Sequence, residues 1–374
     1  MTRYLDIHVV QPVPPSNLNR DDAGSPKQAT FGGVRRARVS SQAWKRAARK
    51  HFSEHQPTLE QATRTQRISR ILTDRIVERT GIDGETAERI TAALRKSLGI
   101  KDGKRKDETP YLLFFGRAQL EPVVDQIEAL LPGLADLEGD DLEAALADIS
   151  LQTALGEGHP VDVALFGRMV ADLPNLNVDA SVQVAHALST HPVETEFDYF
   201  TAVDDEKDRN DGDDAGAGMI GTVEFNSSTL YRYATLGVDL LAENLDGDAE
   251  ATAKAARAFV EGFVKSMPTG KQNTFANRTL PSAVVVVVRD DQPVNLVSAF
   301  EDPVRPPHVP SSLQRLVDEL RETSDLWGSS PVQVLATYRP ADAGDGAEEV
   351  LGAPVPFDEL LDGVEAASEP APVS

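Results

Sequence analysis

Residues 31–52 read FGGVRRARVSSQAWKRAARKHF, and they predict an amphipathic helix that follows a basic segment. Ser40 or Ser41 suits the position before the first turn, where a hydroxyl accepts a hydrogen bond from a free backbone N–H. The side expected to pack on a core has five residues at helical spacing: Trp44, Ala47, Ala48, His51 and Phe52. The opposite side has four basic residues: Lys45, Arg46, Arg49 and Lys50. One face of the helix should therefore pack while the other faces water or phosphate.

The segments around this helix predict a sheet. Tyr4 to Val10 alternates loosely before a cluster of prolines, as a first strand would, and Ala283 to Val288 is an apolar run typical of a buried central strand. Aromatic residues flank the Asp- and Gly-rich tract from Asp204 to Gly218, which predicts two strands joined by a long tip. Glu243 to Ser266 predicts an alanine-rich helix. This order of elements is compatible with an α+β fold of the ferredoxin-like type, a common RNA-binding platform.

Two segments do not fit that sheet. Thr58 to Leu155 is mostly helical in pattern, with one strand signal at Tyr111 to Phe115, and it predicts a helical insertion. After Pro340 the chain is rich in acidic residues, Pro, Gly and Ala and has no basic residue. The tail, residues 341–374, is therefore predicted to be disordered.

Charge is spread unevenly along the chain. The formal net charge of −23 at pH 7 argues by itself against nucleic-acid binding, because Lys and Arg supply phosphate contacts. However, residues 23–53 contain eight basic residues and no acidic one, so the remaining chain has 29 basic and 60 acidic residues, a formal charge of −31. Such asymmetry is typical of a basic face kept for a polyanion, although a solvated helix face would account for part of it.

The residue types favour binding over catalysis. Cysteine is absent, which excludes disulfides, thiolate catalysis and zinc fingers. No glycine before Lys271 has the spacing of a phosphate-binding loop, and His186 and His191 are expected to have a core or capping role rather than to bind a metal. We predict no catalytic residue, no metal and no cofactor. Since the sequence shows neither a signal-peptide pattern nor a long apolar run, we expect a soluble, cytoplasmic protein without a membrane partner.

Several features would suit a nucleic-acid backbone. Gly32 and Gly33 would let backbone N–H groups approach an anion closely, and the free N–H groups of a helix starting near Ser40, Ser41 and Gln42 favour phosphate. Lys and Arg side chains pair with phosphate, and aromatic residues offer stacking surfaces. None of these groups reads base edges, so the predicted binding is directed at the backbone and tolerates any base sequence.

Six blocks of sequence occur in order between the N-terminus and residue 274. They are NRDD at 19–22 with FGGVRRARVSSQAWKRA at 31–47, VALFGRM at 163–169, AHA at 185–187 with TH at 190–191, DYFTAVDD at 198–205, YRYA at 231–234, and GKQNT at 270–274. Together they resemble the CasC family, the repeated backbone ("Cas-seven") subunit of type I-E CRISPR Cascade complexes.

The resemblance implies a fold shaped like a right hand. The palm, with an RRM-like, ferredoxin-type sheet, would be discontinuous and comprise residues 1–57, 156–191 and 229–340. Residues 58–155 would be the helical fingers, and residues 192–228 the thumb, a long hairpin. The thumb of this chain is more acidic than the family leads us to expect.

The resemblance also implies roles for individual residues. The positions that would bind CRISPR guide RNA (crRNA) are Asn19, Arg20, Arg35, Arg36, Ser40, Ser41, Gln42, Lys45, Arg46, Arg49, Lys271, Gln272 and Thr274. Those that would wedge beside a displaced base are Met169, Thr201 and Val203. Weaker candidates for DNA contact are Lys27, Lys101, Lys104, Arg105 and Lys106.

The implied function is that of a non-catalytic subunit in antiviral defence. Several copies would polymerise along one crRNA and present it for pairing with target double-stranded DNA in an R-loop. The expected partners are other copies of the chain and the remaining Cascade subunits, namely the large subunit, the small subunit, the crRNA-processing endonuclease subunit and the subunit that caps the 5′ end.

Two other hypotheses stay open. Backbone subunits of other CRISPR types use a thumb carboxylate to cut target RNA, which would make Asp204 or Asp205 catalytic in an RNA-cleaving effector subunit. The net charge also suits a purely structural, oligomerising protein that binds no nucleic acid.

Overall fold

The computed structural model describes residues 2–56, 60–100, 103, 108–134, 136–202 and 219–369. The chain divides into two compact units. The first comprises Met1–His51, Val184–Thr235 and Arg257–Ala367, and the second comprises Phe52–Gln183, Leu236–Ala256 and Ser368–Ser374. The second unit is thus larger than the predicted helical insertion, because it also takes in residues 156–183 and 236–256.

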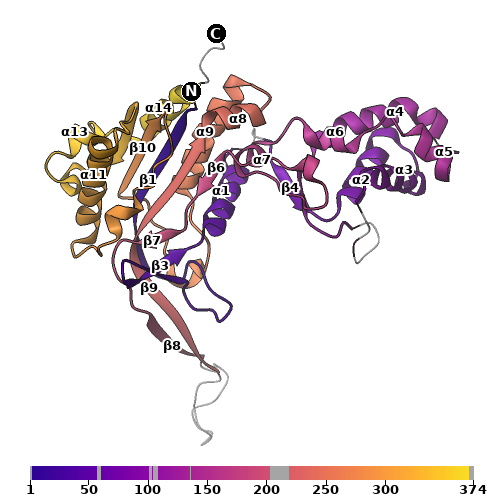
Figure 1. Ribbon diagram of the computed structural model, residues 1–374. Coiled ribbons are helices and arrows are strands. Elements are labelled where there is room, and N and C mark those ends of the chain that lie inside the picture. Colours follow the sequence, from indigo (N-terminus) through magenta and orange to yellow (C-terminus); the bar gives the residue numbers. More distant parts are fainter. Residues whose placement is uncertain are drawn as a thin grey trace, which may run out of the picture. The chain divides into compact units, whose positions relative to one another are not determined.

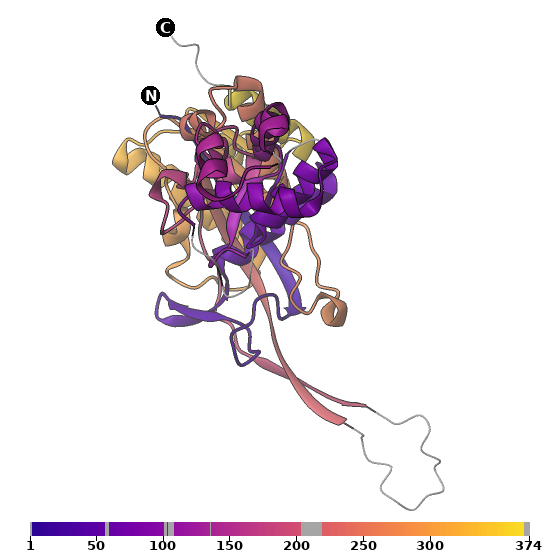
Figure 2. The ribbon, with the colours of Figure 1, turned by 90° about the vertical axis from the view of Figure 1, so that its right-hand side faces the viewer.

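The fold is mixed α/β with a large antiparallel sheet. From edge to edge the strands follow the order β11-β10-β1-β9-β7-β3-β2, and β6 and β8 pair with β9 beside that path. The strands are β1 (Tyr4–Ser16), β2 (Gln28–Phe31), β3 (Val34–Val39), β6 (Val182–Val184), β7 (Ala187–Ser189), β8 (Glu196–Ala202), β9 (Met219–Gly237), β10 (Ala283–Arg289) and β11 (Gln333–Tyr338). β8 pairs with β9 from Glu196 opposite Phe225 to Ala202 opposite Met219, and the two strands form a long ribbon (Figure 2).

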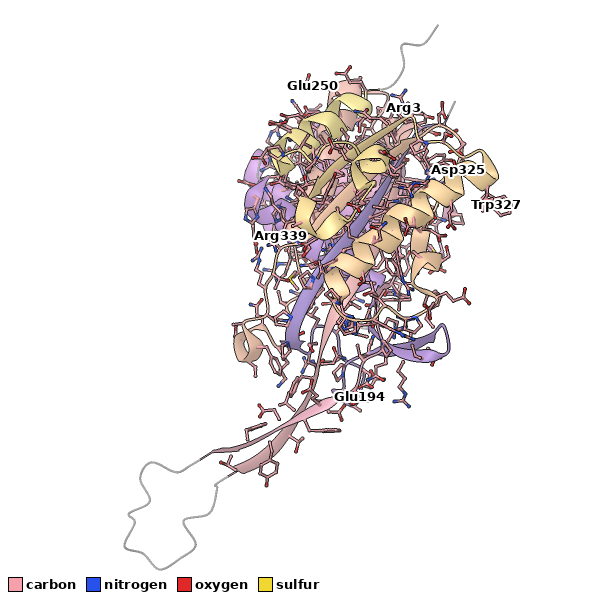
Figure 3. All side chains as sticks on the ribbon, turned by 90° about the vertical axis from the view of Figure 1, so that its left-hand side faces the viewer. Arg3, Glu194, Glu250, Asp325, Trp327 and Arg339 are labelled. Carbon is pink, nitrogen blue, oxygen red and sulfur yellow. The ribbon has the colours of Figure 1, made fainter. Side chains whose placement is uncertain are left out.

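Helices cover both faces of this sheet in the first unit (Figure 1). On one face, Val285 and Val287 of β10 share a buried cluster with Leu316 and Leu320 of α11 (His308–Trp327). That cluster also includes residues of η3 (Leu296–Phe300). In Figure 3, Trp327 marks the exposed C-terminal end of α11.

The side chain of Arg232 in β9 lies on the opposite face of the large sheet. Its neighbours Tyr231 and Tyr233 belong to the cluster under α11, and side chains alternate along a strand. The Arg232 guanidinium lies 3.7 Å from the ring centroid of Trp44 in α1 (Ser41–His55) and 4.5 Å from that of Phe263 in α9 (Ala249–Lys265). Both helices therefore pack on this face of the sheet.

Two predictions about packing are confirmed and one is wrong. All five residues on the predicted packing side of α1 are buried, and so are all seven residues of β10. The first strand, however, does not end before the prolines but continues to Ser16. Its pairing with β10 ends at Val10, opposite Ala283, so Pro12 and the prolines after it interrupt no hydrogen bond of that ladder.

The predicted disorder of the tail is wrong for residues 341–369. Residues after Arg339 form α12 (Pro340–Ala343), α13 (Ala347–Leu351) and α14 (Phe357–Ala367). Leu351, Leu360, Leu361 and Val364 are buried, so four apolar residues of the tail lie on packed faces. Val355 N–H donates to the Ala336 carbonyl at 2.9 Å, which occupies part of the otherwise open edge of β11.

The second unit is mainly helical. Its helices are α2 (Ile68–Thr80), α3 (Gly84–Ser97), η1 (Ala118–Leu120), α4 (Glu121–Leu134), α5 (Gly139–Ala145), α6 (Leu151–Gly156), α7 (Val161–Phe166), η2 (Pro174–Leu176) and α8 (Val238–Asn244). Its strand β5 (Leu113–Gly116) pairs with β4 (Ala62–Thr65), a strand that the sequence did not predict. One continuous core joins α2, α3, α4 and α6.

Candidate nucleic-acid interface

The basic segment before α1 is a strand of a tight hairpin. β2 and β3 are joined by Gly32 and Gly33, whose φ angles of 57° and 75° are those of a type I′ turn. A Cβ at Gly32 would lie 1.6 Å from the Glu301 carbonyl oxygen. The Gly pair was predicted to let N–H groups approach an anion, but the turn and the approach of Glu301 account for both glycines.

The crRNA-binding role predicted for Arg36 is also corrected, because the Arg36 side chain lies in the interior. The residue is fully buried. Its guanidinium donates to four carbonyl oxygens, those of Phe31 at 3.1 Å, Ser189 at 3.2 Å, Phe300 at 2.8 Å and Glu301 at 3.3 Å. These bonds tie the β2–β3 hairpin to β7 and η3, so Arg36 holds the fold together and does not face a phosphate.

We expect Arg36→Met to lower the free energy of unfolding by about 2–3 kcal/mol, since buried carbonyls lose a charged donor. Arg35→Met is the matched control, because Arg35 is exposed on the same strand, and it should change stability by less than about 0.5 kcal/mol. Urea unfolding of the two variants measures the difference. Equal losses would contradict the structural assignment of Arg36.

The start of α1 is capped from two sides. Ser40 Oγ accepts from Ala43 N–H at 3.4 Å, as predicted for the residue before the first turn. Ser41 N–H donates to His186 Nδ1 at 2.9 Å, and the His186 side chain thus has the capping role predicted for it. Desolvation lowers the pKa of His186, and the positive charges of Arg38 and Lys27 lower it further. The helix start therefore lies in a region of positive potential.

A loop of residues 17–27 joins this helix start to the β8–β9 ribbon. Asn19 Oδ1 accepts from Ser40 N–H at 2.8 Å, and its carbonyl accepts from Lys27 N–H at 2.8 Å. Asn17 Nδ2 donates to the carbonyls of Gly24 and Glu224, each at 2.9 Å. The two Asn side chains thus fix the position of the loop. Arg20, which lies between Asn19 and Lys27 in the sequence, is exposed.

The segment with Lys271 packs against the same loop. A Cβ at Gly270 would lie 2.2 Å from the Leu18 carbonyl oxygen, so only glycine allows this approach. Lys271 has φ 50° and precedes the short α10 (Gln272–Phe275). The ring of Phe275 lies 5.6 Å from that of Phe225 on β9, centroid to centroid. These contacts bring Lys271 beside both the loop and the base of the ribbon.

Most predicted crRNA-binding residues of the first unit therefore come together around this loop. The set formed by the loop, the α1 start and the α10 segment comprises Asn19, Arg20, Ser40, Ser41, Gln42, Lys271, Gln272 and Thr274, together with Lys27, which was predicted as a DNA contact. We call it the loop interface. Arg38 and His186 also belong to it, although neither was among the predicted crRNA-binding residues, and Asn17 and Gly270 support it. Arg38 is half-buried, and the run of basic residues before α1 was the available signal for it.

The remaining predicted residues lie elsewhere or are not described. Along α1, Arg46 is exposed and Lys45 and Arg49 are half-buried, and desolvation lowers the pKa of Lys45. Thr201 is exposed on β8, and Met169 belongs to the second unit and is 86% exposed. The other predicted positions, Val203, Lys101, Lys104, Arg105 and Lys106, and Asp204 and Asp205 of the RNA-cleaving hypothesis, lie outside the described residues.

Two general properties complete the picture. Within the described part of the chain, no three or more His, Cys, Asp and Glu side chains are grouped so that they could hold a metal ion. Over the same residues, no helix has both the length and the apolar character needed to cross a membrane.

The family model described as CT1975-like protein matches residues 5–362. The chain belongs to this family. No curated protein matches the chain. Among solved structures, it is similar to a chain described as "CRISPR RNA-guided surveillance complex, pre-nicking", with 32% identity and a TM-score of 0.80 over 98% of this chain and 100% of the other. A second similar chain, described as "CRISPR RNA-guided surveillance complex", has 27% identity and a TM-score of 0.73 over 97% of this chain and 99% of the other.

Proposed function

We propose that this member of the CT1975-like family is the repeated, non-catalytic backbone subunit of a type I-E CRISPR Cascade complex. Several copies hold the sugar-phosphate backbone of one crRNA and present its bases for pairing with target DNA. The observation that carries the proposal is the meeting of three segments far apart in sequence: the loop of residues 17–27, the α1 start and residues 270–275. The similarity to chains of RNA-guided surveillance complexes over nearly the full length supports the same function.

The chemistry of the loop interface suits phosphate. It offers the positive end of the dipole of a 15-residue helix together with basic side chains such as Arg20, Lys27 and Lys271. Contacts of this kind, to phosphate, position a strand without reading its sequence, so the proposed binding tolerates any base sequence. A guide RNA whose bases must stay free to pair has to be bound in this way, through its backbone.

An RRM-like palm is part of the proposal. The four neighbouring strands β10-β1-β9-β7 follow the ferredoxin-like order, with α1 between β1 and β7 in sequence and α9 between β9 and β10. Both helices pack on one face through Arg232, as this topology requires. The β8–β9 ribbon would then be the thumb. The partners would be further copies of the chain, the other Cascade subunits and the target DNA.

The direct test is expression with the genomic neighbours and a CRISPR array, followed by sequencing of the RNA that copurifies. We expect guides of uniform length with repeat-derived ends. RNA of random sequence, or none, would overturn the proposal.

A second measurement addresses the phosphate contacts. Guide affinity should fall with salt with a log–log slope of about −0.7 for each contact, and Arg46→Gln, which removes one exposed charge on α1, should reduce the slope by about that amount. Arg339→Gln is the matched control, because Arg339 is exposed after β11 at the opposite edge of the sheet (Figure 3). Identical slopes in both variants would argue against an RNA contact at Arg46.

A further inference from the structure

The second unit contains a pocket that the proposed guide contacts do not use. It has a volume of about 420 Å³ and lies between the first turns of α2 and the facing side of α3, which pack side by side (Figure 1). Arg67, Ser69 and Arg70 line it from α2, and Arg95 lines it from α3. Three arginines and three hydroxyl residues, Ser69, Thr73 and Thr91, thus line one small volume.

Ser69 is the group that the fold itself does not explain. The residue is 6% exposed, and its Oγ has no hydrogen-bond partner among the described residues. Burying a hydroxyl without a partner costs stability, and alanine would fit the same space. Because Ser69 lines the pocket, a bound group there would supply the missing partner.

The helix end beside Ser69 is also unsatisfied. α2 has 13 residues, and its N-cap residue Arg67 makes no side-chain hydrogen bond to the first turn. The first turn has no acidic residue, although the positive end of a helix favours one, and it carries Arg70 instead. Backbone N–H groups of Ile68, Ser69 and Arg70 have no carbonyl partner within the helix at these positions. An anion would satisfy these N–H groups and interact favourably with the positive end of the helix dipole.

Carboxylates in the lining do not prevent this. Arg67 Nε lies 3.3 Å from Glu108 Oε1, and Arg70 Nε lies 3.7 Å from Asp74 Oδ2. The Arg70 and Asp74 side chains are 69% and 70% exposed, and ion pairs in water are weak, so the guanidinium can exchange its partner. With Glu88, the lining has three carboxylates against three arginines, which makes binding modest and sensitive to salt.

We propose that this pocket binds a phosphate group. Ser69 Oγ and the N–H groups of residues 68–70 would contact its oxygens, and Arg67 and Arg70 would close over it. The phosphate is either a phosphodiester of a nucleic acid or a free phosphate compound. The site is separate from the loop interface and does not depend on the proposed function.

The test is a titration of the full chain with inorganic phosphate at constant ionic strength, followed by amide chemical shifts of residues 68–70. We expect saturable shifts, with affinity at least fivefold lower in Ser69→Ala and Arg70→Gln. Ser69→Ala should fold normally, since the hydroxyl it removes has no partner among the described residues. Arg89→Gln, on α3 but outside the pocket lining, is the matched control and should bind as the wild type does.

A second arm replaces phosphate by a DNA duplex of unrelated sequence. Shifts at the same amides, lost in Ser69→Ala, would assign the pocket to nucleic-acid phosphates, whereas shifts with inorganic phosphate alone would assign it to small phosphate compounds. Shifts that grow without saturation, or that are equal in wild type and Ser69→Ala, would overturn the proposal.

Discussion

Arg289→Met should lower the free energy of unfolding by about 3–5 kcal/mol, because it leaves the Asp6 carboxylate buried without its partner. Arg289 Nε donates to Asp6 Oδ2 at 3.1 Å, and both side chains are 0% exposed. The Arg289 Nη1 group also donates to the carbonyl and the hydroxyl of Ser329, each at 2.9 Å. This pair joins β1 to β10 beneath α11, in the middle of the sheet that supports the loop interface.

The loss should depend on pH. Burial raises the pKa of Asp6, although the Val294 N–H, Tyr233 and Arg289 lower it in part. Without Arg289 the pKa rises further above the unfolded value, so the folded variant takes up a proton more readily than the unfolded chain. Stability of the variant is then lost as pH rises from about 4 through the folded pKa, and its deficit against wild type is smaller at pH 5 than at pH 8.

Urea unfolding at both pH values measures this, with Asp6→Leu/Arg289→Met as the control. The double variant buries no charge, so it should recover most of the loss. A double variant as unstable as Arg289→Met alone would show that the cost comes from packing rather than from the unpaired carboxylate.

The elements that the sequence predicted are those with a regular pattern of apolar residues. The spacing of Trp44, Ala47 and Ala48 predicted both α1 and its packed face, and the valines of β10 predicted a buried strand. The tail shows the limit of composition, because its acidic residues hid Leu360, Leu361 and Val364, which are spaced as one helical face.

The loop interface could be predicted only in part. The resemblance pointed to Lys271 and Arg20, and charge pointed to the basic segment as a whole. Neither the resemblance nor the charge could distinguish exposed Arg35 from buried Arg36. The Gly-Gly pair is nevertheless a hairpin signal, and a hairpin places Arg35 and Arg36 on opposite faces. Asn17 and Gly270 left no pattern at all, because their roles depend on contacts with backbone atoms of residues more than 200 positions away.

Gly270→Ala should weaken binding of guide RNA by about 30-fold, or ~2 kcal/mol, although it removes no charge and no hydrogen-bonding group. The new Cβ would lie 2.2 Å from the Leu18 carbonyl oxygen, and 2.6 Å from its carbon, so either the loop or the Lys271 segment must move by about 1 Å to reach ordinary contact. Leu18 stands between the two Asn anchors of the loop. Movement there would therefore displace Arg20, the α1 start and Lys271 relative to one another.

Fluorescence anisotropy with a labelled guide RNA measures the loss, and Gly84→Ala is the control, since a Cβ at Gly84 meets no atom within 4 Å. The salt slope separates two causes. If the segments keep their phosphate contacts but lose their mutual geometry, affinity falls at every salt concentration and the slope stays the same. If some contacts no longer reach the strand, the slope drops by about 0.7 for each. If Gly270→Ala binds guide RNA with wild-type affinity, the three segments bind RNA independently. Binding that depends on a fixed spacing of the segments must weaken when one of them is displaced.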